Sequence, residues 1–321
     1  MAIITNAYDT YEATSNREDL SNVIYNISPM ETPLVSLGGK RSVRNVQFDW
    51  QTESLPAATS TGVLEGGEIS REVSTGTTRA ANVCQINTRN ATVTGSQQAS
   101  DPAGKKSEMA HQMSVIGRAL KRDVEKTICG PQGRNNGAAA TVRATRGFES
   151  WITTNAGRAT TGTAGANAAN ENSAPTDGTQ RAFTETILKD VLSTCFTNGA
   201  HPSVMLVGAY NKQKVSGFSG RASATQAVAL EGIPADHVQA AVSVYTSDFG
   251  DIKIIPSNFS RARSALLVDP EYVGTSYLRS FETQDLGGIG DAETKAIYVE
   301  FGLEMKNEAA NGVCADLTTS D

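Results

Sequence analysis

Residues 105–133 read KKSEMAHQMSVIGRALKRDVEKTICGPQG and form the clearest helical pattern of the chain. Apolar side chains recur there at spacings of three and four, which places them along one side of a helix. They are Met109, Met113, Ile116, Leu120, Val124 and Ile128. Gly130 and Pro131 follow, as is usual just past a helix end. The sequence therefore predicts a helix over residues 105–129.

The opposite side of this helix is basic. It carries Arg118, Lys121, Arg122 and Lys126. Basic side chains in such a row either face solvent or contact an acidic neighbour.

Two alternating runs precede the helix. The first contains Val46, Phe48 and Trp50, and the second covers residues 82–95, with a long polar span between them. Two strands joined by a long polar segment predict a long two-stranded finger. Because an isolated ribbon is marginal in water, the finger must lie on something, which indicates a partner subunit. Residues 1–45 have weak periodicity and predict an arm that takes its order from what it lies against.

A composition shift follows the helix. Residues 131–180 are rich in Gly, Ala, Asn and Thr, which predicts a long surface loop anchored by Phe148 and Trp151. A second compact block begins at residue 183 with an amphipathic helix capped by Thr184 and ended by Gly199. Its apolar side contains Ile187, Leu188, Val191, Leu192, Cys195 and Phe196. A short strand at 202–208, a short helix at 209–218 and strand-rich runs at 264–281 and 294–317 complete the expected elements.

The segment SVYTSDFGDIKIIPSNF, residues 243–259, contains Asp248-Phe249-Gly250, the magnesium motif of protein kinases. A kinase also needs a Gly-rich loop upstream, a strand lysine and a His-Arg-Asp loop, and the chain has no His-Arg-Asp. Apolar residues alternate on both sides of the motif, so it predicts the structural turn of a β-hairpin. Gly250 supplies the positive φ that such a turn requires.

Composition excludes several other classes. The chain has 321 residues and a formal net charge of −6, which gives no basic footprint for nucleic-acid recognition. Cys84, Cys129, Cys195 and Cys314 lie far apart and the three histidines are isolated, so we expect buried reduced thiols rather than a zinc or redox site. No signal peptide or membrane-spanning run is present, which predicts a soluble product made in a cytoplasm.

No hydrolase elbow, metalloprotease helix or phosphate-binding loop occurs in the sequence. We therefore expect no catalytic, cofactor-binding or metal-binding residues and no cofactor.

Several short segments carry a resemblance to a known family. They are NVQFDWQTESL (45–55), ALKRDVEKTI (119–128), YTSDFGDIKIIPSNF (245–259), YLRSF (277–281), GDAETKAIYVEFGLEMKNEAANG (290–312) and DL (316–317). Their order and spacing resemble the major capsid proteins of tailed bacteriophages, which have the Hong Kong 97 type of fold, and in particular the podophage SU-ten type.

The resemblance implies an α+β capsid fold with distinct parts. These are an N-terminal arm (1–45), an extended loop lying on the neighbouring subunit (46–95), a peripheral domain (96–182) with its spine helix at 105–129, an axial domain (183–262), and peripheral strands with the C-terminus (263–321). The loop at 216–240 would crowd its symmetry mates around the capsomer axis.

The implied function is structural. Such proteins self-assemble through hexamers and pentamers into the icosahedral head that encloses double-stranded DNA. The resemblance implies location in the virion, with the host cytoplasm as the site of assembly. It also implies a separate scaffolding protein, a portal, and a cement or decoration protein as a further partner. Non-specific DNA contact at the lumenal face would involve Lys40, Arg41 and Arg44.

Three rival functions remain to be weighed. One is an encapsulin-type nanocompartment, which has the same fold, and another is an enzyme with an unmarked site. The third is a tail or adhesion protein, which the long helix and the lack of β-repeats disfavour.

The acidic stretch of the extended loop predicts subunit contacts. Glu53, Glu65 and Glu68 precede the first base, Arg71, so we expect a neighbour to neutralise them. The candidate bases are Arg118, Arg122 and Lys126 on the helix, or Arg261, Arg263 and Arg279. No lysine lies between Lys40 and Lys105, so the loop has no amine for an isopeptide cross-link between subunits. We expect burial, arm exchange or a cement protein to stabilise the assembly.

Overall fold

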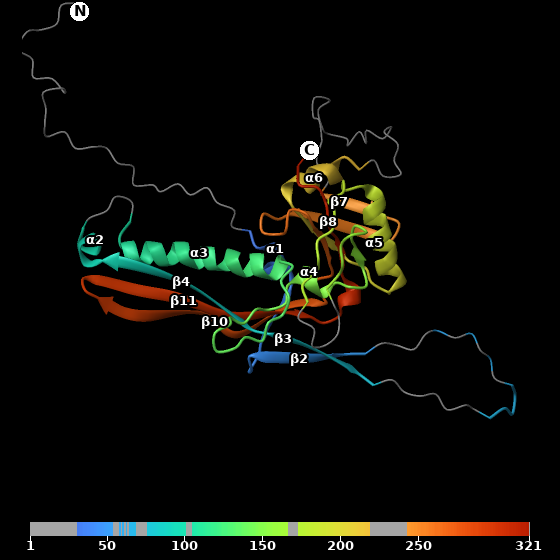
Figure 1. The fold of residues 1–321 in the computed structure, drawn as a ribbon, viewed down its shortest axis with the longest axis horizontal. Helices are drawn as coiled ribbons and strands as arrows, with labels where there is room; N and C mark the ends of the chain where they lie inside the picture. The colour runs from blue at the N-terminus through green and yellow to red at the C-terminus, as the bar shows by residue number, and fades with distance from the viewer. Residues whose placement is uncertain are drawn as a thin grey trace, which may run out of the picture.

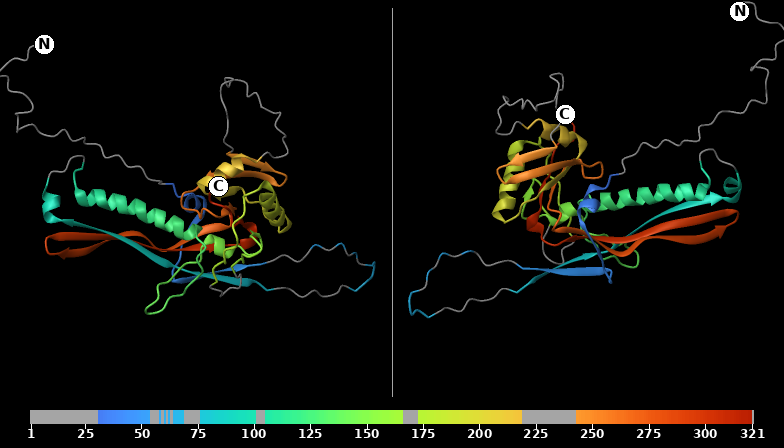
Figure 2. Two further views of the ribbon diagram at one scale, coloured as in Figure 1. Left: turned by 45° about the horizontal axis from the view of Figure 1, so that its top comes forward. Right: turned by 180° about the vertical axis from the view of Figure 1, so that it is seen from behind.

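The computed structural model describes residues 31–53, 58, 60, 62, 64–68, 76–100, 105–165, 173–218 and 243–320. Within these ranges the molecule is elongated, with a long helix over a sheet at one end and a compact block at the other (Figure 1). A two-stranded ribbon leaves this body at the junction of the two parts (Figure 2). Residues 1–30 of the predicted arm and residues 219–240 of the predicted loop at 216–240 lie outside the described residues.

The long helix is α3, Glu108–Cys129, which confirms the predicted helix. It begins at Ser107, whose hydroxyl accepts a hydrogen bond from the Ala110 N–H at 3.3 Å, and ends at Gly130. Its apolar stripe is the side that packs inward: Leu120 and Ile128 are fully buried.

A four-stranded sheet lies beneath α3 in the order β1-β10-β11-β4. Its strands are β1 (Gly39–Ser42), β10 (Val273–Ile289), β11 (Ala292–Met305) and β4 (Gln85–Thr94). The long β10–β11 hairpin and β4 are antiparallel, and β1 joins β10 in parallel. Ala91 and Val93 face the helix and pack with Met109, which fixes α3 along the sheet.

A short helix, α1 (Pro33–Leu37), is attached to α3 by a buried carboxylate. Glu125 of α3 is fully buried and accepts hydrogen bonds from the N–H groups of Leu34 at 2.8 Å and Val35 at 2.9 Å. Two backbone donors that the first turn of a helix leaves unpaired are thereby satisfied. This contact fixes where the chain enters the described body.

The ribbon is formed by β2 (Gln47–Thr52) and β3 (Thr78–Val83), paired antiparallel over their whole length. This differs from our expectation that residues 82–95 supply the second strand, because β4 instead pairs with β11. Only Cys84 separates β3 from β4. The alternating run at residues 82–95 is therefore divided between two strands with different partners, because β3 pairs with β2 and β4 pairs with β11.

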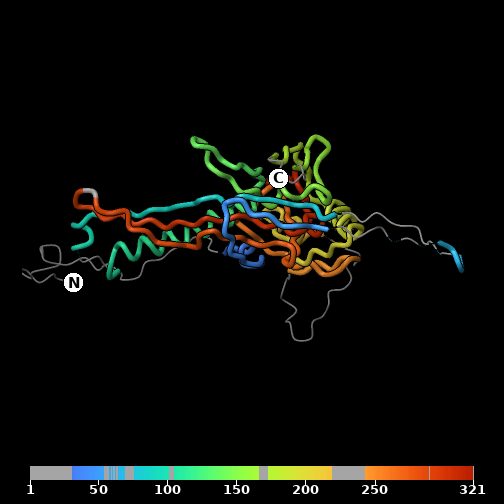
Figure 3. Tube along the Cα trace, turned by 90° about the horizontal axis from the view of Figure 1, so that it is seen from below, coloured from blue at the N-terminus to red at the C-terminus, as the bar shows by residue number. Residues whose placement is uncertain are grey.

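The base of the ribbon is packed into the body. The Trp50 and Trp151 ring centroids lie 5.4 Å apart. A Cβ on Gly302 of β11 would lie only 2.6 Å from Cε1 of Phe48, so this close contact requires glycine. The base is therefore rigidly held, while the remainder extends away from the sheet (Figure 3).

The compact block is built on a six-stranded sheet in the order β5-β12-β9-β6-β8-β7. The strands are β5 (Ala156–Gly157), β12 (Gly312–Cys314), β9 (Ala265–Val268), β6 (Val204–Val207), β8 (Gly250–Pro256) and β7 (Val244–Ser247). Because side chains alternate along a strand, β6 serves two cores. Val204 and Leu206 join the core beneath α3, and Met205 and Val207 join a second core beneath α5 (Glu185–Thr197).

The hairpin around Asp248-Phe249-Gly250 is confirmed. Strands β7 and β8 pair antiparallel, with Ser247 opposite Gly250, and Asp248 and Phe249 form the turn between them. Gly250 has a φ of +128°, which a side chain would disfavour. The kinase-like residues are therefore a structural turn.

Helix α5 begins after Thr184 as predicted, but the Thr184 side chain makes no capping hydrogen bond. The prediction that Phe196 lies inside is wrong. Phe196 is 50% exposed at the last turn of the helix. Its ring lies against Phe249 at a centroid distance of 4.9 Å and against His201 at 5.5 Å. The helical pattern could not show that the core ends one turn earlier. A short helix, α6 (Ala209–Ser216), follows β6 as predicted.

Most of the Gly- and Ala-rich span was predicted to be a surface loop, interrupted at residues 146–154 by the anchors Phe148 and Trp151. Residues 145–152 are all buried, which agrees with this interruption. They include α4 (Phe148–Trp151), whose Phe148 and Trp151 are the anchors that we expected. Residues 135–144 form a small hairpin that projects from the body (Figure 3). The remaining short elements are α2 (Gly95–Ala99) and a 3₁₀ turn (Glu308–Ala310).

Candidate subunit interface

The acidic residues predicted for subunit contact are exposed on the ribbon. Glu53, Glu65 and Glu68 are all solvent-accessible, and none of them forms an ion pair within the described ranges. Arg71 lies outside the described residues. These carboxylates are therefore free to meet a base from another chain.

Residues 64–68, which lie between β2 and β3 in the sequence, form an ordered turn that we call the tip turn. Its Gly67 N–H donates to the Leu64 carbonyl at 2.8 Å, and Gly66 has a φ of +77°, as a type II turn requires. The Leu64 side chain is 87% exposed and stands beside Glu65 and Glu68. The tip turn thus presents an apolar side chain among carboxylates.

The basic side of α3 borders a groove, which we call the helix-end groove. It is lined by Arg122, Asp123, Lys126, Thr127, Gly130, Pro131, Gln132 and residues 258–261. Neither Arg122 nor Lys126 forms an ion pair with another described residue, whereas Asp123 binds Arg89, with Arg89 Nη2 and Asp123 Oδ1 2.9 Å apart. Arg118 is exposed and donates to its own helix at Ser114 O.

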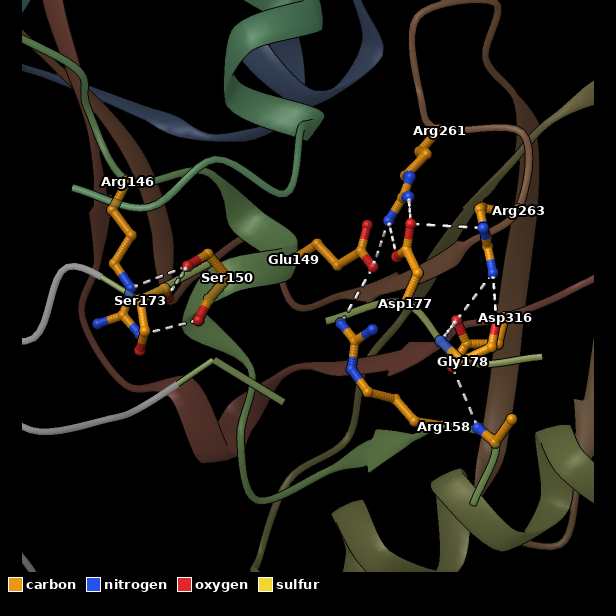
Figure 4. Close-up of polar contacts among 11 residues, drawn as sticks. Arg146, Glu149, Ser150, Arg158, Ser173, Asp177, Gly178, Arg261, Arg263 and Asp316 are labelled. Atoms are coloured by element: carbon orange, nitrogen blue, oxygen red, sulfur yellow. Dashed lines mark hydrogen bonds and ion pairs between the residues drawn. The ribbon is translucent and has the colours of Figure 1, made fainter. Parts of the chain in front are cut away.

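Arg261 lines the same groove as Arg122 and Lys126. Its guanidinium is, however, bound to two carboxylates of its own chain (Figure 4). Arg261 Nη1 donates to Asp177 Oδ1 at 2.7 Å and to Glu149 Oε1 at 3.3 Å. Glu149 is fully buried and also accepts from Arg158 Nη2 at 3.0 Å. The hydrogen bond from Arg261 lowers the pKa of Asp177, which keeps that carboxylate charged.

Arg263 is also committed within the chain. Its Nη2 donates to the Gly178 carbonyl at 2.7 Å and to Asp316 Oδ1 at 3.2 Å. Asp316 has a φ of +59° and accepts from the N–H groups of Ala159 and Gly178 at 3.1 and 2.8 Å. Arg263 and Asp316 therefore hold the backbone at Ala159 and Gly178 beside the six-stranded sheet.

Arg279 lies on β10, away from the helix-end groove. Its Nε donates to Glu300 Oε2 at 3.0 Å, while Arg143 donates to the other oxygen of Glu300 at 2.6 Å. Glu300 is buried, so both arginines compensate its charge. Among the basic candidates of the contact set, only those on α3 are without a carboxylate partner in the described part of the chain.

Sequence reasoning missed the ion-pair network of Glu149, Arg158, Asp177 and Asp316. The partners Arg261 and Asp177 are separated by 84 positions, and a charged residue in a Gly-rich stretch looks like an ordinary loop residue. The only indication of this network in the sequence was the pair Phe148 and Trp151. Because these anchors are expected to be buried, charged residues next to them are expected to be buried too.

The remaining sequence candidates lie apart from the groove. Lys40 and Arg44 are exposed, and Arg41 pairs with Glu304 at 3.0 Å. The four cysteines are buried and free, as expected, and burial raises the pKa of Cys84, Cys195 and Cys314 to about 12. Among the described residues, no group of three or more His, Cys, Asp or Glu side chains could hold a metal ion. Nor is any helix of the described part long and apolar enough to cross a membrane.

Comparison with known proteins decides the family. The family model described as SU10 major capsid protein matches residues 3–318. The chain belongs to the SU10 major capsid protein family. A major capsid protein of Escherichia phage Phieco32 is 28% identical over 128 residues, which are 40% of this chain and 36% of the relative. The match thus spans about a third of that curated relative.

Solved structures show the same fold. The capsid asymmetric unit of cyanophage A-1(L) superposes with a TM-score of 0.68 at 13% identity, covering 97% of this chain and 99% of the other. The SrpI encapsulin complex from Synechococcus elongatus PCC 7942 gives a TM-score of 0.52 at 12% identity, covering 96% and 94%. These likenesses confirm the predicted α+β fold of the Hong Kong 97 type.

Membership of the SU10 major capsid protein family also decides between the rival interpretations. The family is one of structural capsid proteins, which agrees with the expectation that the chain is not an enzyme. The encapsulin resemblance is limited to the fold, whereas the capsid family model covers almost the whole sequence.

Proposed function

We propose that this chain is the shell protein of a tailed-phage head and that it assembles with copies of itself into an icosahedral capsid around double-stranded DNA. The observation that carries this proposal is the family match over residues 3–318. The shape of the chain supports it, because the segment between β2 and β3 exposes Leu64 beside Glu65 and Glu68, and these carboxylates form no ion pair among the described residues.

The proposal includes the way in which copies meet. Closed shells repeat heterologous contacts around rotational axes, so each chain must offer several different surfaces. Hexamers and pentamers would use the compact block as the axial domain, with α3 and its sheet as the peripheral domain. We keep the division implied by the resemblance, except that β4 now belongs with the peripheral sheet rather than with the extended loop.

The contact residues follow from the charges. Glu53, Glu65 and Glu68 would meet bases of a neighbouring copy, and Arg118, Arg122 and Lys126 are better suited than Arg261, Arg263 and Arg279. The latter three already compensate carboxylates of their own chain. Removing any of the three would take an ion-pair partner from a buried carboxylate of the same chain, so the isolated subunit would be destabilised before any effect on assembly.

Further partners belong to the same proposal. Assembly in the host cytoplasm would use a separate scaffolding protein and a portal, and a cement or decoration protein would bind the finished shell. DNA contact would be non-specific and electrostatic, with Lys40 and Arg44 as the exposed bases of the set proposed for it. Because the ribbon segment has no lysine, we propose a shell without isopeptide cross-links, and ladders of covalent oligomers on a denaturing gel would contradict this.

The test is direct. The chain is produced with its neighbouring phage genes, the lysate is sedimented, and the fast fraction is viewed by electron microscopy. The proposal predicts icosahedral shells in which this chain is the dominant protein and from which nuclease-protected DNA is recovered. A chain that stays at the mass of a monomer or dimer would overturn it. Shells that contain a protein cargo and no DNA would instead support an encapsulin-type compartment.

A further inference from the structure

We propose that the helix-end groove of one subunit receives the tip turn of a second copy of this chain, with Leu64 on the groove floor and Glu65 and Glu68 against Arg122 and Lys126. This inference rests on the proposed shell function and adds the place at which the ribbon docks.

The tip turn has the properties of a docking element. Leu64 is 87% exposed, the largest exposed fraction of any large apolar side chain in the described residues together with Val142. The hydrogen bond within the turn holds Leu64 and Glu65 in a fixed relation, so little conformational freedom remains to be lost on binding. Burial of Leu64 against another chain would remove this apolar surface from water.

The helix-end groove offers matching chemistry. Pro131 and Phe259 are partly buried and supply apolar surface, while Arg122 and Lys126 form a basic wall. Both bases lack an ion pair within the described ranges, and the one acidic side chain in the lining, Asp123, is already bound by Arg89. Two uncommitted cations in the groove thus correspond to two uncommitted carboxylates on the tip turn.

The helix dipole acts against this arrangement, but only close to the helix end. The C-terminal end of α3 carries partial negative charge, and its effect is limited to the last turn. Lys126 lies in that turn and compensates it, whereas Arg122 lies one turn earlier. We therefore expect Arg122 to be the stronger partner of the two.

The occupant must come from another copy. The ribbon leads away from α3, and the described residues 64–68 lie at its far end (Figures 1 and 2). A rival surface exists around Ile86 and Val142, which are both exposed. Its base, Arg143, is already bound to Glu300, so that surface lacks the free positive charge that the tip turn requires.

The first experiment is a charge swap in full-length chains. Glu65→Lys with Glu68→Lys, and separately Arg122→Glu with Lys126→Glu, should each reduce the shell fraction in a sedimentation assay by about tenfold or more. All four substitutions together should restore most of it. A matched control, Lys106→Glu with Lys121→Glu, makes the same change of charge at exposed lysines outside the groove and should leave the yield unchanged.

The outcomes separate the two proposals. Wild-type chains that form no shells would overturn the shell function itself. Wild-type shells with full assembly of both charge-reversed variants would overturn the docking inference alone, as would equal losses in the control pair. The docking inference would also be contradicted if the variant with all four substitutions did not recover the shell fraction while each charge-reversed pair still gave folded subunits by circular dichroism.

A second experiment locates the contact without changing charge. Leu64→Cys combined with Asn258→Cys, at an exposed position of the groove lining, should form a disulfide between subunits when assembled shells are oxidised. The dimer would appear on a non-reducing denaturing gel. Leu64→Cys with Thr283→Cys, on the exposed part of β10, should give none. Dimers from the second pair, or their absence from the first, would place the tip turn elsewhere.

Discussion

Asn82 is the residue whose removal should most clearly loosen the ribbon from the body. It lies in β3, and its side chain is fully buried. Its Nδ2 donates to the Leu303 carbonyl at 2.6 Å and to Thr145 Oγ1 at 3.1 Å. Its Oδ1 accepts from the Arg146 N–H at 2.9 Å. One amide therefore joins β3, β11 and the segment before α4.

The size of the effect follows from these bonds. Asn82→Ala takes a partner from two buried backbone groups, the Leu303 carbonyl and the Arg146 N–H, and each loss costs about 1–3 kcal/mol. We expect the free energy of unfolding to fall by about 2–6 kcal/mol. With a urea m-value of about 3 kcal/mol/M, the midpoint should move down by about 0.7–2 M.

Tryptophan fluorescence of unassembled subunits is the assay, because the only two tryptophans, Trp50 and Trp151, lie side by side at the base of the ribbon. Asn90→Ala is the matched control, since Asn90 is exposed on β4, and surface changes stay within about 0.5 kcal/mol. Asn82→Asp keeps the acceptor oxygen but loses the hydrogen bonds that Nδ2 donates, so this variant should also be destabilised. A midpoint for Asn82→Ala equal to that of the control would refute the reasoning.

Three further predictions follow. Gly302→Ala should shift the Trp emission and lower the free energy of unfolding by about 1–3 kcal/mol, because the added Cβ would lie 2.6 Å from Phe48. Gly39→Ala is the control and should have little effect, since a Cβ there has nothing within 4 Å. Equal unfolding midpoints for the two variants would contradict this prediction. Burial raises the pKa of Glu125 above its ordinary 4.5, so its contribution to stability is complete below that pH and is lost as pH rises through the folded pKa. Wild-type stability relative to Glu125→Gln should therefore decline as the pH rises above 4.5, and unfolding midpoints of the two proteins that run in parallel across the pH series would refute it. The four buried thiols should not react with a thiol reagent at about pH 8 until urea is added, and rapid modification of native subunits would show that the burial is wrong.

The sequence predicted the elements whose pattern is local. Helix α3 was found because its apolar stripe has the helical period, and the β7–β8 hairpin because two alternating runs meet at a glycine. The change of partner at Cys84 could not be found, because the alternating run at residues 82–95 passes without a break from the end of β3 into β4. Nor could the burial of Glu149, because its stabilising partners Arg158 and Arg261 become neighbours only when the chain is folded.

The candidate interface was predictable in part. The exposed Glu65 and Glu68 and the basic face of α3 could be identified from charge and periodicity alone. That Arg261, Arg263 and Arg279 are bound within their own chain required the structure, since an arginine in a loop gives no sign of its partner. No sequence pattern marks Leu64 as an exposed apolar residue, because only the fold shows that nothing in the described part of its own chain covers it.

The measurement that tests the central claim most directly is a cryo-electron microscopy reconstruction of particles assembled from this chain. The account predicts an icosahedral shell built from repeated copies of this fold, with the tip turn (residues 64–68) of each copy lying on a neighbouring copy. A shell in which the tip turn lies on its own chain, or a preparation that contains only soluble subunits, would contradict it.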